Sequence, residues 1–275
     1  KGNNFAKAAI EMSWWSLRST MTEIPLHRLL GGQSREVEVG ADFGIQDSID
    51  MLLGNIQNAV ESNALRVKLK ISKGWDLDVL RAVRNAFPNI ILHIDCNAGY
   101  TLDDLPFFKA IDDMNLAFIE QPLQYFDVLD HAKLARQIQT PICLDETIVG
   151  VKIAEQAIQE KACKYINIKP GRVGGLTNAV AIHDLAEQHG VAVWVGGMLE
   201  SALGSSICVE LATLSNFKYP GDIFPSSRFY LEDLSEPVLE LTPRNTFKPL
   251  NSPLPKPNLQ RLSELTVRSK SIVNK

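Results

Sequence analysis

Three carboxylates and a lysine follow one another at even intervals along the chain. Asp95, Glu120, Asp145 and Lys169 each close a short apolar run, and about one βα unit separates each from the next. The carboxyl ends of successive parallel strands share one rim of a barrel, so we expect these side chains to converge. Converging carboxylates repel one another unless a cation neutralises them. The pattern therefore predicts a site for a hard divalent cation, Mg²⁺ or Mn²⁺.

Lysines flank this row of carboxylates in the sequence. Lys68 and Lys70 are two residues apart in one apolar run, so their side chains face the same side of a strand. A divalent cation and a neighbouring ammonium both lower the pKa of a lysine toward the value that a general base needs. The same cation would bind a substrate carboxylate and stabilise the negative charge that develops when the α-proton leaves. Proton abstraction next to a carboxylate is the chemistry predicted.

Each residue also has an ordinary structural explanation. A single strand-end Asp or Glu is more often a helix cap or a surface group, and a Lys-X-Lys pair is usually a solvated edge. The combination on consecutive strands favours the metal site. His93 lies two residues before Asp95 and therefore points inward at a deeper level. We interpret His93 as a core histidine.

The elements that position these residues alternate regularly. Short runs rich in Val, Ile and Leu alternate with amphipathic stretches, the pattern of a parallel sheet. The expected strands are 36–41, 65–71, 90–95, 116–120, 141–145, 164–168 and 191–196, with a short eighth at 218–223. The expected helices include 76–87, one that starts at the capping-box-like segment 101–104, and 176–188. An open sheet would carry a glycine-rich phosphate loop after its first strand, which this sequence lacks, so we predict an α/β fold of the TIM-like (β/α)7β barrel type.

We expect three parts along the chain. Residues 1–32 form an N-terminal helix leading into the barrel, 33–236 form the barrel, and 237–275 form a proline-rich tail with a short helix at 259–268. The first helix would expose Ile10, Trp14 and Leu17 with little before it to cover them. That exposure suggests a missing N-terminal portion or burial in a neighbouring subunit, so we expect a homo-oligomer.

Composition narrows the functional classes. The 275 residues are 45% hydrophobic and 22% charged, with a formal net charge of −4, so the chain lacks the basic excess of a nucleic-acid-binding protein. An apolar run long enough to cross a membrane and a signal peptide are both absent from the sequence, and we expect a cytoplasmic protein. Four cysteines without metal-site or redox spacing are expected to be reduced, buried thiols. They are Cys96, Cys143, Cys163 and Cys208.

Several ordered motifs resemble one known family. They are Lys68-Leu-Lys70, Asp95-Cys-Asn97, Ile119-Glu120-Gln-Pro122, Leu144-Asp145-Glu146, Asn167-Ile-Lys169-Pro-Gly-Arg-Val-Gly-Gly-Leu176 and Gly196-Gly-Met-Leu-Glu-Ser201. The set is similar to the muconate-lactonizing-enzyme subgroup of the enolase superfamily, whose barrel is a C-terminal domain. Within that subgroup it most resembles o-succinylbenzoate synthases and N-acylamino acid racemases. The resemblance runs from about Asn4 to Asp222.

The resemblance implies a role for each matching residue. Mg²⁺ would be bound by Asp95, Glu120 and Asp145. The α-proton would be removed by Lys70, Lys169 would face the other side of the substrate, and Lys68 would support Lys70 and the substrate carboxylate. Metal ligands would be oriented by Asn97 and Glu146. The substrate pocket would be lined by Gly196, Gly197 and Met198.

The implied partner is a small carboxylate substrate, and the implied activity is that of a lyase. An o-succinylbenzoate synthase removes water from 2-succinyl-6-hydroxy-2,4-cyclohexadiene-1-carboxylate in menaquinone synthesis. An N-acylamino acid racemase moves an α-proton between faces with the same residues, so the motifs leave both activities open. The family's N-terminal capping domain is absent from this sequence, which also leaves open an inactive, metal-binding barrel.

One position departs from the family pattern. Asp42 stands at the end of the first expected strand, where relatives usually have serine. Its charge would either weaken the binding of an anionic substrate or cap the following helix, and we favour the cap.

Overall fold

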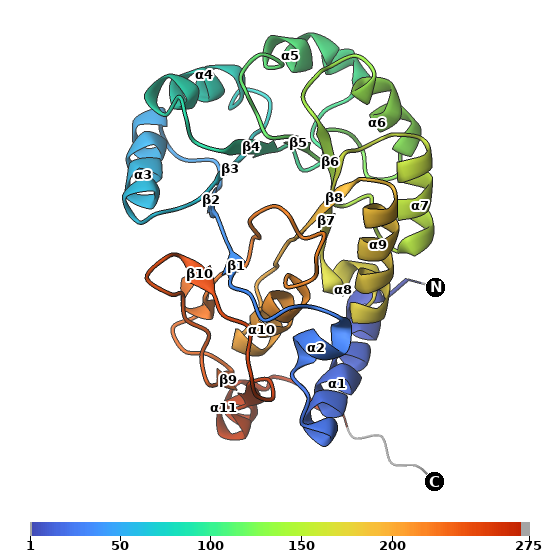
Figure 1. The fold of residues 1–275 in the computed structure, drawn as a ribbon. Helices are drawn as coiled ribbons and strands as arrows, with labels where there is room; N and C mark the ends of the chain where they lie inside the picture. The colour runs from blue at the N-terminus through green and yellow to red at the C-terminus, as the bar shows by residue number, and fades with distance from the viewer. Residues whose placement is uncertain (1, 271–275) are drawn as a thin grey trace.

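A curved parallel sheet of seven strands organises the molecule, as the computed structural model of residues 2–270 shows (Figure 1). The strands follow one another in sequence order, so each is hydrogen-bonded to the next along the chain. They are β2 (Ala41–Phe43), β3 (Val67–Lys70), β4 (Leu92–Asp95), β5 (Ile119–Glu120), β6 (Ile142–Leu144), β7 (Tyr165–Ile168) and β8 (Ala192–Val195). This order confirms the predicted α/β barrel.

Helices lie along the outside of the curved sheet (Figure 1). They are α3 (Ile49–Glu61), α4 (Leu77–Ala86), η1 (Leu102–Asp104) with α5 (Leu105–Ala110), α6 (Val128–Ala135), α7 (Val151–Gln159), α8 (Pro170–Val173) and α9 (Leu176–Gln188). The helix expected at 76–87 is confirmed, with Asp76 accepting a hydrogen bond from the nitrogen of Leu77 at its start. The helix predicted at 176–188 matches α9, and the capping box beginning at Thr101 is present.

An irregular segment closes the barrel between β8 and the first strands. Parallel bridges join Val193 to Phe217, Gly196 to Asp222, and Val39 to Gly221. The strand expected at 218–223 therefore has the expected position but is not a regular strand. A reason lies in Pro220, which has no N–H to donate to a ladder.

The predicted first strand is wrong in its placement. Residues Val37–Glu38 form β1, which pairs antiparallel with β10 (Thr246–Phe247) of the C-terminal segment, and the barrel strand begins only at Ala41. Between them, Gly40 passes over the buried side chain of Arg66, where an added Cβ would lie 2.3 Å from Nε. The chain therefore stops pairing with β10 and begins to pair with β3 where it passes Arg66.

Aromatic and sulfur-bearing side chains fill the interior of the barrel. Phe118, Cys143 and Trp194 form a buried cluster, and the Trp194 indole donates a hydrogen bond to Cys143 Sγ at 3.2 Å. All four cysteines are buried and unpaired, as predicted. His93 is fully buried above Phe118, with ring centroids 4.4 Å apart, so its assignment to the core is confirmed.

The N-terminal helices brace the side of the barrel (Figure 1). They are α1 (Asn4–Thr22), which packs against α8 and α9, and α2 (Leu26–Leu30), which packs against α10 (Ala202–Leu211). Glu11 of α1 accepts hydrogen bonds from the nitrogens of Leu176 (2.7 Å) and Thr177 (2.9 Å), and so caps α9 from another helix. A side chain at Gly175 would collide with this carboxylate, which explains why glycine stands at the second position of the Gly174-Gly175 pair. The opposite face of α1 is exposed, as expected, at Ile10, Trp14 and Leu17.

The C-terminal part packs against the open side of the sheet (Figure 1). It contains α10 (Ala202–Leu211), η2 (Ser226–Arg228), β9 (Ser235–Glu236), β10, β11 (Lys256–Pro257) and α11 (Leu259–Leu265). The short helix expected near 259–268 is confirmed as α11, whereas the division at residues 32 and 236 stays a prediction. Within residues 2–270, every helix is too short or too polar to span a bilayer.

A surface carboxylate offers a test of how the βα units are held together. Asp112 follows α5 and accepts hydrogen bonds from the nitrogens of Gln139 (2.8 Å) and Thr140 (2.7 Å) in the loop before β6. Burial opposes its charged form, but these bonds outweigh burial and the pKa of Asp112 is lowered. A lowered pKa in the folded state stabilises the protein above the unfolded pKa, and this contribution is lost as pH falls through the folded pKa.

We expect Asp112→Ala to lower the free energy of unfolding by about 1–3 kcal/mol near neutral pH. The difference from the parent chain should shrink below about pH 4, as urea unfolding at several pH values would measure. Asp113→Ala is the matched control, because Asp113 is exposed beside it. A destabilisation that persisted undiminished at low pH would argue against the carboxylate hydrogen bonds as its cause.

Candidate functional site

A cavity of about 280 Å³ opens at the carboxyl ends of the strands. It is lined by Asp42, Lys68, Lys70, Asn97, Glu146, Lys169, Arg172, Gly197, Met198, Leu199, Asp222, Phe224, Arg228 and Phe229. Seven of the residues predicted for the site are in this set. The three predicted metal ligands lie deeper, and Gly196 lies behind Lys169.

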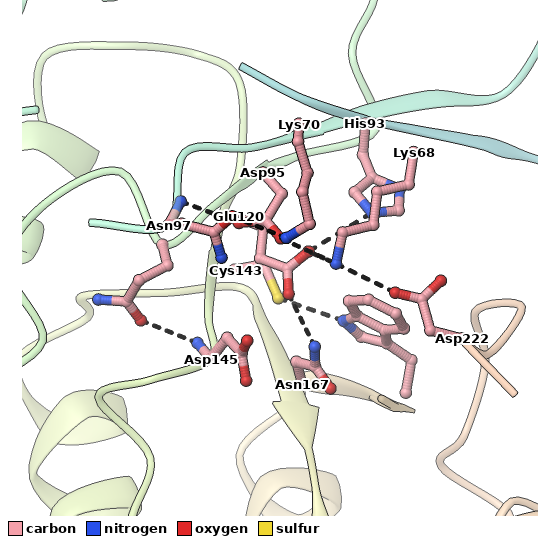
Figure 2. Close-up of polar contacts among 12 residues, drawn as sticks. Lys68, Lys70, His93, Asp95, Asn97, Glu120, Cys143, Asp145, Asn167 and Asp222 are labelled. Atoms are coloured by element: carbon pink, nitrogen blue, oxygen red, sulfur yellow. Dashed lines mark hydrogen bonds and ion pairs between the residues drawn. The ribbon is translucent and has the colours of Figure 1, made fainter. Parts of the chain in front are cut away.

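The three predicted metal ligands end consecutive strands and are almost fully buried. Asp95 and Glu120 are direct partners in the register of β4 and β5, and Asp145 follows β6 directly. Their exposed fractions are 1%, 0% and 0%. The even spacing in the sequence therefore corresponds to one row of carboxylates along the rim of the barrel (Figure 2).

Lys68 is the cation at the centre of this row. Its Nζ lies 3.0 Å from Asp95 Oδ2, 2.8 Å from Glu120 Oε2 and 3.0 Å from Asp222 Oδ2. Figure 2 shows the ammonium between Asp222 on one side and the strand-end carboxylates on the other. Lys68 is only 3% exposed, so its ion pairs are shielded from water.

The other two predicted lysines stand at opposite ends of the row. Lys70 Nζ donates to Asp95 Oδ2 at 3.0 Å and to Asn97 Oδ1 at 2.7 Å. Lys169 Nζ donates to Asp145 Oδ2 at 2.9 Å, and Arg172 pairs with the other oxygen of Asp145. The side chain of Lys70 is 39% exposed and that of Lys169 is 12% exposed. Both ammonium groups therefore border the cavity from different strands.

The predicted orienting residues contact each other and the row. The Asn97 nitrogen donates to Asp95 Oδ1 at 3.0 Å, and Asn97 Nδ2 donates to Glu146 Oε1 at 3.1 Å. Asn97 has a φ of 42°, a left-handed conformation that asparagine tolerates better than most residues. This turn links the end of β4 to the loop after β6.

The glycines after β8 leave room for the lysine and for the backbone opposite. A Cβ on Gly196 would lie 2.2 Å from Asn167 Oδ1 and 2.7 Å from Lys169 Cε. The Gly197 nitrogen donates to the carbonyl of Asp222 at 2.8 Å. Met198 lines the cavity, and its nitrogen donates to the Glu200 carboxylate. Close packing around Lys169 explains why glycine stands at position 196, the first of the Gly196-Gly197 pair.

The carboxylates of the row differ in the direction of their pKa shifts. Burial raises the pKa of Glu120, and the charge of Asp95 raises it further. Burial also raises the pKa of Asp145 and of Glu146. Burial acts the same way on Asp95, but the charges of Lys68 and Lys70 outweigh it and the pKa of Asp95 is lowered. The pKa is thus lowered at Asp95 and raised at Glu120, Asp145 and Glu146.

Lysine protonation depends on these carboxylates. Burial disfavours the charged form of Lys169, but the charge of Asp145 outweighs it and the pKa of Lys169 is raised. A general base must be neutral, so the pKa of a lysine here falls only when its carboxylate partners are neutralised by another cation. The predicted lowering of lysine pKa values is therefore tied to metal binding.

Two polar residues of the network were not predicted as site residues. Asp222 accepts hydrogen bonds from Lys68 and from the buried Arg66, and Asn167 Nδ2 donates to Glu120 Oε1 at 2.7 Å. Asn167 lies two residues before Lys169, so strand alternation could have identified it. Asp222 ends the irregular closing segment, and an acidic residue at the end of a strand was the available signal.

The prediction that Asp42 caps a helix is wrong. The helix that follows, α3, is capped by Ser48, whose side chain accepts a hydrogen bond from the Met51 nitrogen at 3.2 Å. Asp42 instead lines the cavity, and its buried Oδ1 has no hydrogen-bond partner within residues 2–270. Burial raises the pKa of Asp42, and the charge of Asp222 raises it further. Its effect on anionic substrates stays a prediction.

The carboxylate row fits a hard divalent cation in its donor chemistry. Across residues 2–270, no three Asp, Glu, His or Cys side chains already form a metal cage, because basic side chains lie between the carboxylates. Asp95, Glu120 and Asp145 nevertheless offer only oxygen ligands. Oε2 of Glu146 is buried without a hydrogen-bond partner in the described part of the chain. Such an atom is costly unless a cation satisfies it.

Comparison with known proteins identifies the family. Residues 53–243 match the family described as enolase C-terminal domain-like. The chain belongs to the enolase superfamily. The resemblance drawn from the motifs is thereby confirmed, as is the identification of the barrel as a C-terminal domain of this superfamily.

Close relatives carry two functional names. The chain is 45% identical over 240 residues to an N-succinylamino acid racemase of Thermus thermophilus, covering 87% of this chain and 65% of the relative. It is 46% identical over 239 residues to an o-succinylbenzoate synthase of Geobacillus kaustophilus, covering 87% of this chain and 64% of the relative. The chain thus spans slightly less than two thirds of the length of these superfamily members.

Solved structures of the superfamily share the fold. A member from Listeria innocua superposes with a TM-score of 0.92 at 36% identity, over 96% of this chain and 71% of that one. A dipeptide epimerase from Cytophaga hutchinsonii, complexed with Mg and the dipeptide D-Ala-L-Val, superposes with a TM-score of 0.87 at 25% identity, over 96% of this chain and 73% of that one.

Metal addition and removal test the donor set. We expect Mg²⁺ at about 100 times its dissociation constant to raise the free energy of unfolding by about 2.7 kcal/mol, because only the folded chain brings the carboxylates together. A chelator should reverse the gain in a thermal or urea unfolding measurement. Asp145→Asn should reduce it, while Asp184→Asn, on the exposed surface of α9, should leave it unchanged. Equal Mg²⁺ stabilisation of all three chains would contradict the assignment of the ligands.

Proposed function

We propose that the protein is an o-succinylbenzoate synthase, a Mg²⁺-dependent lyase that dehydrates 2-succinyl-6-hydroxy-2,4-cyclohexadiene-1-carboxylate in menaquinone biosynthesis. The observation that carries the proposal is the pair of lysines, Lys70 and Lys169, at opposite ends of a buried carboxylate row beside one cavity. A small carboxylate substrate in this cavity would have a lysine on either side. The 46% identity to a synthase supports the same reaction.

Each residue of the site would have its own role in this reaction. Mg²⁺ held by Asp95, Glu120 and Asp145 would neutralise the substrate carboxylate and the negative charge that develops beside it. Lys70 Nζ removes the α-proton, the electron pair left on the α-carbon forms a C=C bond as the C–O bond of the neighbouring carbon breaks, and the protonated Lys70 gives its proton to the departing hydroxide to form water. Lys169, on the other side, stabilises the developing charge. Asn97 holds Lys70 at 2.7 Å and so fixes the direction of proton transfer.

The racemase is the alternative within the same site. A racemase of Thermus thermophilus is 45% identical to the chain, as close as the synthase. In that reaction Lys70 and Lys169 would exchange roles, one removing the α-proton of an N-acylated amino acid and the other returning a proton to the opposite face. Both reactions begin with the same proton abstraction, so the substrate decides between them.

A third possibility is a barrel that binds metal but does not turn over substrate. The chain matches only 65% and 64% of the length of the two relatives, so their activity concerns more polypeptide than this chain provides. Apolar side chains that line the cavity support a covered site, because Met198 is 43% exposed and Leu199 is 64% exposed. Removal of water from such a site is part of catalysis.

We further propose that the protein forms a homo-oligomer.

Turnover of both substrate types tests these proposals. The synthase substrate and N-succinyl amino acids would be assayed with Mg²⁺ and with chelator, on this chain and on a chain joined to the N-terminal part of a relative. Faster formation of o-succinylbenzoate than racemisation supports the synthase, and the reverse supports the racemase. If the longer chain alone is active, the barrel depends on its cover.

Lysine substitution tests the proposed base pair. We expect Lys70→Ala and Lys169→Ala each to lower kcat by about 10²–10⁴-fold, because each removes a proton-transfer or charge-stabilising group. Lys73→Ala is the matched control, since Lys73 pairs with Asp104 outside the cavity. Circular dichroism would verify folding of each variant. Activity that survives both active-site substitutions would contradict the two-lysine mechanism.

A further inference from the structure

A buried glutamine joins the strand ends that carry the carboxylates. Gln121 directly follows Glu120 at the end of β5 and is 0% exposed. Its φ of 37° is left-handed, which is uncommon for a residue other than glycine. The backbone of Gln121 donates to the carbonyl of Cys143 at 2.8 Å and accepts from the nitrogen of Ala98 at 2.8 Å. Gln121 thus contacts the segments after β4 and within β6 through its backbone alone.

The side-chain amide of Gln121 completes the connection. Its Oε1 accepts from the nitrogen of Asp145 at 3.0 Å and from that of Thr147 at 3.1 Å. Its Nε2 donates to Thr147 Oγ1 at 2.8 Å and to the carbonyl of Leu123 at 3.0 Å. Both acceptor positions and both donor positions of the amide are therefore used.

The neighbours fix the orientation of this amide. The nitrogens of Asp145 and Thr147 can only donate, and the carbonyl of Leu123 can only accept, so Oε1 must face β6. His131 supports the same loop, because its Nε2 accepts from the Leu123 nitrogen at 3.2 Å while Nδ1 donates to the Asp127 carbonyl at 2.6 Å. Neither glutamate nor an apolar residue of the same length can make all four amide contacts.

We propose that Gln121 is a positioning residue for the divalent cation, acting through the backbone of Asp145. Asp145 is the carboxylate farthest along the row from Lys70, and it also binds Lys169 and Arg172. Holding its backbone nitrogen fixes where the carboxylate stands relative to Glu120, the residue that precedes Gln121. The inference rests on the proposed metal site and adds to it the residue that sets its geometry.

Direct Mn²⁺ binding tests this role without an activity assay. Titration calorimetry and the electron paramagnetic resonance signal of bound Mn²⁺ would be compared for the parent chain, Gln121→Met and Gln124→Ala. Gln124 is the matched control, because it lies in the same loop and donates to the Ala98 carbonyl at 2.7 Å but does not contact Asp145. We expect Gln121→Met to raise the Kd for Mn²⁺ by about 10–100-fold and Gln124→Ala to leave it unchanged.

A milder variant keeps the test decisive if Gln121→Met does not fold. Thr147→Val removes only the hydroxyl that accepts from Gln121 Nε2, and should raise the Kd by less than Gln121→Met does. Unchanged Mn²⁺ affinity in a folded Gln121→Met chain, or in Thr147→Val if that is the only folded variant, would overturn the positioning role. A parent chain that binds no Mn²⁺ would instead overturn the proposed metal site, so the two failures are distinguishable.

Discussion

The burial of several carboxylates around one ammonium group is the constraint on which the site depends. Lys68 lies within 3.0 Å of oxygens from Asp95, Glu120 and Asp222, and all four residues are at most 5% exposed. Charges buried this deeply are tolerated only when they are paired and hydrogen-bonded. The register of β3, β4 and β5 therefore determines the ion pairs of Lys68 as well as the backbone hydrogen bonds. A shift of one residue would turn the lysine away from its partners.

The interior of the barrel below this network excludes water. Trp194 and Tyr219 lie on the side of Arg66, whose guanidinium carbon is 5.5 and 6.0 Å from their ring centroids. His93 donates to or accepts from the Tyr219 hydroxyl at 2.8 Å, and burial lowers its pKa well below the usual value, so it adds no charge. The layer of buried aromatic side chains beneath the charged residues lowers the local dielectric constant and so strengthens the electrostatic interactions above it. Charge stabilisation at the mouth of the barrel is thereby favoured.

Strand periodicity made much of this arrangement predictable. The intervals between Asp95, Glu120 and Asp145 indicated successive strands, and the spacing of Lys68 and Lys70 indicated a shared face. Both inferences follow from the length of a βα unit and from side-chain alternation, which are properties of the backbone. The family resemblance supplied the roles that periodicity could not.

Contacts made outside regular strands were not predictable in the same way. Asp222 belongs to a segment interrupted by Pro220, so its approach to Lys68 follows from barrel closure and not from any local pattern. The pairing of residues 37–38 with the C-terminal segment has the same origin, since long-range partners decide which short apolar run becomes a barrel strand. The position of Asp42 in the cavity also depends on that displaced first strand.

The central claim is that Lys70 and Lys169 approach one substrate carbon from opposite faces. Exchange of the α-proton of N-succinyl amino acids in D₂O with Mg²⁺ measures this directly, for each enantiomer and for Lys70→Ala and Lys169→Ala. We expect each variant to lose exchange of a different enantiomer and to retain exchange of the other. Loss of exchange of the same enantiomer in both variants would place the two lysines on one face and contradict it.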